Sequence, residues 1–105
     1  MEQSLNIDVQ TVLVIGRKDY IVQTYSDIAQ KEGYKVIVAY TDEEVYRALK
    51  SKSVNILLVS GGVEPNSKIA FREFIIQNGL SIRVVEHFGG PATLPNELQS
   101  TSKAS

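Results

Sequence analysis

The sequence contains no cysteine, which excludes disulfide bridges, thiolate metal sites and a cysteine nucleophile. It also lacks an excess of either charge, since eleven basic residues nearly balance twelve acidic ones and neither sign forms a long run. This removes the electrostatic footprint of a nucleic-acid or membrane-surface binder. No apolar stretch approaches the roughly 20 residues that span a bilayer, and residues 1–10 lack the basic start and apolar core of a signal peptide. We therefore predict a cytoplasmic protein without nucleic-acid or membrane partners.

The composition that remains is typical of a globular protein, with 43% hydrophobic and 22% charged residues in 105 positions. A chain of this length forms one domain and buries roughly 65% of its unfolded surface, so it folds without a metal. We predict a polar lead over residues 1–10, a single domain over 11–99 and a flexible tail over 100–105.

The stretch that organises the chain is residues 54–62, VNILLVSGG. It is short, apolar and rich in β-branched residues, and it ends in a serine and two glycines. Such a run predicts a strand buried on both faces, as at the centre of a parallel sheet. Functional residues in such sheets follow the carboxyl ends of the strands. Here that position holds no acid, cysteine or histidine.

Three further apolar runs, over 11–16, 34–40 and 81–87, predict strands. Segments with helical spacing begin near residues 20, 41 and 65 and separate these strands. Strands alternating with helices predict a parallel sheet with right-handed crossovers. We predict an α/β fold, a three-layer flavodoxin-like sandwich with a four-stranded parallel sheet in the order 2-1-3-4. The fourth strand carries more charge than the others and is predicted to be an edge.

Several residues mark the ends of the predicted helices. Asp19 is a candidate N-cap of the first helix, and Thr41 with Glu44 matches a capping box at the second. Gly33 is expected to end the first helix in a left-handed conformation, and Asn78 with Gly79 is expected to close the third helix.

Between residues 11 and 86 the chain resembles the receiver domain of two-component response regulators. Val12–Ile15 is similar to the first strand of that family, and Glu32–Val36 to the entry of its second strand. Asp42–Leu49 resembles its second helix, and Val54–Ser60 its third strand. The resemblance implies a flavodoxin-like fold and a role in signalling.

This chain departs from the receiver pattern at the residues that carry the family's chemistry. Receivers hold magnesium with an acidic pair after the first strand, where this chain has Gly16 and Arg17. They accept a phosphoryl group on an aspartate at the end of the third strand, where this chain has Ser60. Their hydroxyl residue after the fourth strand falls near Glu86, and their fifth strand is missing. The comparison implies a degenerate, shortened receiver that is not phosphorylated on an aspartate.

We therefore predict a non-catalytic interaction module, with no catalytic residue, metal or cofactor. Its partner is predicted to be another protein or a second copy of this chain, and the expected arrangement is a homodimer through the fourth strand and the third helix. The reason is that the missing fifth strand leaves this strand and this helix without cover. A short helix over 93–98 would supply part of that cover. The predicted interface residues are Phe71, Phe74, Ile75, Arg83, Val85 and His87.

An alternative function is a small nucleotide- or anion-binding Rossmann-like protein. Glycines let backbone N–H groups approach a phosphate near the start of a helix, and basic side chains add charge. The residues at the predicted crevice between the first and third strands are Gly16, Arg17, Ser60, Gly61 and Gly62.

Overall fold

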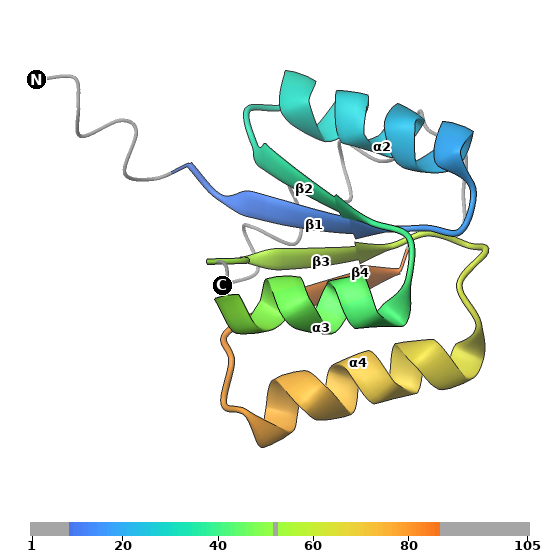
Figure 1. Cartoon of the computed structure of the whole chain (residues 1–105). Helices are drawn as coiled ribbons and strands as arrows, with labels where there is room; N and C mark the ends of the chain where they lie inside the picture. The colour runs from blue at the N-terminus through green and yellow to red at the C-terminus, as the bar shows by residue number, and fades with distance from the viewer. Residues whose placement is uncertain (1–8, 52, 87–105) are drawn as a thin grey trace, which may run out of the picture.

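The computed structural model describes residues 9–51 and 53–86, in which four strands alternate with three helices (Figure 1). The strands are β1 (Thr11–Ile15), β2 (Lys35–Ala39), β3 (Ile56–Val59) and β4 (Arg83–Glu86). The helices are α2 (Asp19–Lys31), α3 (Asp42–Ser51) and α4 (Pro65–Gln77). Each observed strand is shorter than its predicted run within the described residues.

The four strands form one parallel sheet in the order β2-β1-β3-β4, which confirms the predicted topology. At the centre of the register Leu13 on β1 lies between Ile37 on β2 and Leu57 on β3. All four residues of β3 are buried, as the continuous apolar run predicts for a central strand. β4 lies at one edge of the sheet, as its charge content predicts.

The sheet separates two hydrophobic clusters and gives the molecule three layers (Figure 1). On one face α2 packs Val22 and Ala29 against Val12 and Val14 of β1. On the other face α3 and α4 lie side by side over the remaining strand side chains, with Phe71 fully buried there. Successive residues of each strand contribute to opposite clusters, as the period of a β-strand requires.

The glycines predicted to end helices do so. Gly33 has a φ of 95° after α2, and Gly79 has a φ of 64° after α4. Both values lie in the left-handed region that residues with a Cβ rarely adopt.

The predictions at the helix starts need correction. α2 begins at Asp19 itself with Lys18 as its N-cap, so the Asp19 carboxylate does not cap the helix and instead accepts a hydrogen bond from the Tyr40 hydroxyl, 2.8 Å away. Half of the capping box before α3 is present, since the Glu44 N–H donates to Thr41 Oγ1 at 3.1 Å. In the other half the Glu44 carboxylate reaches one residue further back than predicted and accepts the Tyr40 N–H at 2.6 Å.

Some predictions concern parts of the chain outside the described residues. These are His87, the helix over 93–98, the polar lead up to residue 8 and the tail over 100–105. Among the described helices, none is long and apolar enough to cross a membrane.

Candidate functional site

The carboxyl ends of β1 and β3 lie side by side, and Ser60 follows β3 at this point. Its side chain is buried, with 1% of the residue exposed. The hydroxyl donates to the Ile15 carbonyl at 3.0 Å, and the Ser60 N–H donates to the same oxygen at 3.1 Å. The hydroxyl proton is therefore held by the end of β1, which leaves Ser60 as a structural link between the two central strands.

Gly16, the residue after β1, packs directly against Ser60. A Cβ at position 16 would lie 2.8 Å from Ser60 Oγ and 2.8 Å from Val22 Cγ2. Both distances are too short for carbon, so only glycine fits between these side chains. Gly16 and Ser60 were predicted to line one crevice. They do lie side by side, but the Ser60 and Val22 side chains leave no space beside Gly16.

Arg17 extends from this point and joins the three loops that follow β1, β2 and β3. Its guanidinium donates to the Tyr40 carbonyl at 2.9 Å, to Asp42 Oδ1 at 2.5 Å and to Glu64 Oε1 at 2.8 Å. The Ser67 hydroxyl donates to Asp42 Oδ2 at 2.7 Å and lies 3.3 Å from the guanidinium. We call these five residues the Arg17 clamp.

Every charge of the clamp is paired within the chain, with two carboxylates around one cation. The Arg17 hydrogen bond lowers the pKa of Glu64. Partial burial raises the pKa of Asp42, but the hydrogen bonds from Arg17 and Ser67 outweigh it, so that this pKa is lowered overall. The hydrogen bond to Asp42 raises the pKa of Arg17. All three groups are therefore charged at neutral pH, and the one cation is matched by two carboxylates.

This arrangement differs from a metal or anion site. A guanidinium repels a divalent cation, and the two carboxylates beside it are already occupied by its N–H groups. Within residues 9–51 and 53–86 no group of three acidic, histidine or cysteine side chains is placed to hold a metal. Gly61 and Gly62 lie exposed in the turn after Ser60 and keep their backbone accessible.

Sequence reasoning identified Arg17 but missed its partners Asp42, Glu64 and Ser67. A usable signal existed, because each of these residues follows the carboxyl end of a strand predicted to neighbour β1 or β3. In a parallel sheet those ends meet at one edge, which is where opposite charges can pair.

Glu86 makes a second, smaller ionic cluster where β4 ends. Its carboxylate pairs with Arg72 at 2.6 Å and with Lys68 at 3.8 Å, both from α4. The Arg72 hydrogen bond lowers the pKa of Glu86, although partial burial opposes it. The edge strand is thus fastened to α4 by charge.

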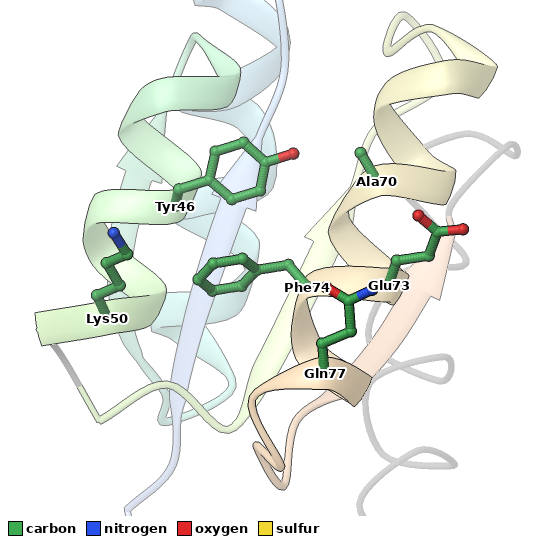
Figure 2. A pocket seen from close by; sticks show the side chains of 6 residues that line it. All are labelled: Tyr46, Lys50, Ala70, Glu73, Phe74 and Gln77. Carbon is green, nitrogen blue, oxygen red and sulfur yellow. The ribbon is translucent and has the colours of Figure 1, made fainter.

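A groove of about 360 Å³ runs between α3 and α4 on the outer surface (Figure 2). The Tyr46 and Phe74 rings lie in it, with their centroids 5.0 Å apart. Lys50 stands on the α3 side and Glu73 on the α4 side, as Figure 2 shows. A further hollow of about 190 Å³ shares Lys50 and Phe74 and extends the groove toward Leu80.

The predicted interface is only partly at the surface. Phe71 and Ile75 are 0% and 6% exposed because they face the sheet, and Val85 is 9% exposed in the cluster on the opposite face. These three side chains belong to the core of this chain and cannot contact a partner, which corrects that part of the prediction. Phe74 and Arg83 are half-buried.

Other apolar side chains of α4 are exposed instead. Ile69 is 55% exposed and Ile76 is 77% exposed. They are two helical turns apart and lie on one side of α4, on either side of Glu73 along the helix. The exposed apolar side chains of α4 are therefore different from the ones that the sequence pattern assigned to its surface.

Comparison with known proteins finds no matching family model and no match among curated proteins. Solved structures do match. A signal receiver domain from Vibrio parahaemolyticus aligns over 91% of this chain and 92% of its own, with a TM-score of 0.77 and 11% identity. A CheY-like response-regulator receiver domain from Methanospirillum hungatei aligns over 93% and 100%, with a TM-score of 0.63 and 14% identity.

A de novo designed Rossmann-fold protein is similar to nearly the same degree, with a TM-score of 0.60, 13% identity and coverage of 90% and 98%. Because these natural receivers and the designed protein all match at only 11–14% identity, the likeness is one of fold. The chain has the receiver-like, flavodoxin-type α/β fold.

Proposed function

We propose that this chain is a receiver-like protein-interaction module of a signalling or regulatory system, and that it is neither an enzyme nor phosphorylated on an aspartate. It docks through a fixed surface, which is held in one conformation by contacts within the chain. The receiver-like fold supports the class of module, and the geometry at the carboxyl edge of the sheet supports the absence of a phosphorylation switch.

The Arg17 clamp is the observation that carries this proposal. It places a cation where receivers have the acidic pair that holds magnesium, and it uses both neighbouring carboxylates to neutralise that cation. Ser60, at the position of the phosphorylated aspartate, has its hydroxyl donated to a backbone carbonyl. A serine without an adjacent base or metal is not an activated nucleophile.

The same contacts argue against anion binding in the crevice. Arg17 would have to leave Asp42 and Glu64 to reach a phosphate, and the Ser60 hydroxyl would have to leave Ile15. Of the predicted ligand residues, only Gly61 and Gly62 are fully exposed, since Arg17 is partly buried and Gly16 and Ser60 are buried. Two exposed glycines supply few donors and no positive charge.

The test is an amide NMR titration of the ¹⁵N-labelled chain with magnesium, followed by beryllofluoride as a mimic of an aspartyl phosphate. We expect no change at the amides of Gly16, Arg17 and Ser60. Saturable shifts centred on these amides would overturn the proposal and establish a receiver-type site.

A second titration uses inorganic phosphate and a panel of nucleotides. Shifts at Gly61 and Gly62 that saturate with one of these anions would favour the anion-binding alternative. The matched control is Lys18→Gln, which removes an exposed neighbouring cation and leaves the clamp intact. Shifts that disappear in this variant would come from nonspecific attraction to the exposed loop, and they would leave the proposal standing.

A further inference from the structure

The outer surface of α3 and α4 combines apolar side chains with two charges that have no ion-pair partner in the described part of the chain. Neither Lys50 nor Glu73 forms an ion pair with a residue that the structure describes. The half-buried Tyr46 and Phe74 rings lie between them, and Ile69 and Ile76 stand exposed beside Glu73. Exposed apolar groups rimmed by polar ones are typical of interaction sites.

The charges on this surface are complementary to each other. Lys50 lies on one wall of the groove and Glu73 on the other (Figure 2). A two-fold axis that runs along the groove exchanges the two walls, so it would place Lys50 of each copy opposite Glu73 of its partner. It would also bring the Phe74 and Tyr46 rings of the two copies close together, where offset-stacked or edge-to-face aromatic pairs are favourable.

The net charge of the chain does not oppose such pairing, since it is only −1 at neutral pH. We propose that the α3–α4 groove is the contact surface of a homodimer, with Lys50 of each copy paired with Glu73 of the other. The inference rests on the proposed function and names its partner as a second copy. It keeps α4, the third helix of the predicted interface, and places α3 beside it where the prediction had β4, whose Val85 is buried and whose Glu86 is paired with α4.

The dimer is expected to be weak. The groove is shallow and offers few large apolar side chains, and interfaces of small area bind transiently. We expect a dissociation constant on the order of 100 μM, measured by sedimentation velocity from about 10 μM to about 1 mM. A full-length chain that stays monomeric at the highest concentration would overturn the inference.

Charge exchange tests the proposed pair. Lys50→Glu and Glu73→Lys each place like charges opposite one another in the dimer, so each variant alone should weaken self-association at least tenfold. A mixture of the two variants should form a heterodimer, because every Lys then faces a Glu. The double variant should recover wild-type association within about threefold, since the pair is only reversed.

Lys31→Glu is the matched control. It reverses one exposed charge at the end of α2, on the opposite face of the sheet, and should leave association unchanged. All the substituted residues are exposed, so the variants should remain folded by circular dichroism. A dimer that is equally stable in all variants would lie elsewhere on the molecule and would contradict the inference.

The outcomes separate this inference from the proposed function. A monomer whose Gly16, Arg17 and Ser60 amides do not respond to magnesium and beryllofluoride overturns the homodimer and keeps the interaction module, with another protein as partner. A response at those amides overturns the proposed function, whatever the oligomeric state.

Discussion

The carboxyl edge of the sheet and the α3–α4 groove use polar groups in opposite ways. At the edge, every charge of the Arg17 clamp has a partner within the chain, and Ser60 and Gly16 fill the remaining space. At the groove, Lys50 and Glu73 have no ion-pair partner among the described residues, and apolar side chains remain exposed. The polar groups at the carboxyl edge are therefore used for contacts within the chain, whereas those at the groove are left to solvent among the described residues.

Ser60→Asp is expected to disturb the packing and hydrogen bonding at the carboxyl edge of the sheet most strongly. The substitution restores the residue type of a phosphorylated receiver in a site that is 1% exposed and faces the Ile15 carbonyl. A buried carboxylate next to a carbonyl oxygen lacks a donor, so we expect a loss of about 3 kcal/mol or more in the free energy of unfolding. Urea denaturation followed by circular dichroism measures it.

Ser60→Ala is the control for that experiment. It removes the same hydrogen bond without adding a charge and should cost about 1 kcal/mol. If the aspartate variant were as stable as the alanine variant, or if it took up magnesium and beryllofluoride, then the edge would be open to receiver chemistry after all.

Gly16→Ala tests how tightly the edge is packed. The added Cβ would meet Ser60 Oγ and Val22 Cγ2 at 2.8 Å, and Val22 is fully buried and cannot retreat. Overpacking of this kind typically costs about 1–3 kcal/mol, and we expect about 2.

Gly62→Ala gives the matched comparison two residues beyond Ser60. A Cβ there meets nothing within 4 Å, and the residue has no positive φ. We expect a change of less than about 0.5 kcal/mol in the same denaturation experiment, or a slight gain. Equal losses in both variants would mean that glycine is needed for backbone freedom and not for close packing.

The sheet could be predicted from the sequence because its information is local. Each buried strand is a continuous apolar run, and helices between runs leave few possible topologies. The partners of Arg17 in the clamp could not be predicted from local sequence patterns, since they lie 25 and 47 positions away along the chain. Local spacing indicated only that Asp42 begins a helix.

Three residues of the predicted interface, Phe71, Ile75 and Val85, are buried, and for the two on α4 the reason is different. α4 carries apolar residues around much of its circumference, with Ile69, Phe71, Ile75 and Ile76 all in one helix. Such a pattern does not specify which side faces the sheet. Packing against α3 and the strands sets the rotation of the helix, which buries Phe71 and Ile75 and leaves the other two exposed.

Arg17→Gln separates the electrostatic contribution of the Arg17 clamp to stability from the contribution of packing at the carboxyl edge. Arg17 is 25% exposed and its partners Asp42 and Glu64 are 37% and 62% exposed. The cost therefore lies between that of a surface pair and that of a buried one, at about 1–2 kcal/mol near neutral pH. Lys18→Gln, the exposed neighbour, should cost less than about 0.5 kcal/mol.

The pH dependence of Arg17→Gln gives the sharper measurement. The pKa values of Asp42 and Glu64 are lowered in the folded chain. Below about pH 5 the unfolded chain therefore binds more protons than the folded chain, and stability decreases as the pH is lowered. This contribution is complete above the unfolded values and is lost as pH falls through the folded ones. The gap in stability between wild type and the variant should therefore be largest at neutral pH and shrink toward pH 3. Glu86 keeps its own lowered pKa through Arg72, so the variant should retain part of the acid dependence. A gap that stayed constant from pH 7 to pH 3 would mean that Arg17 holds the edge by packing alone.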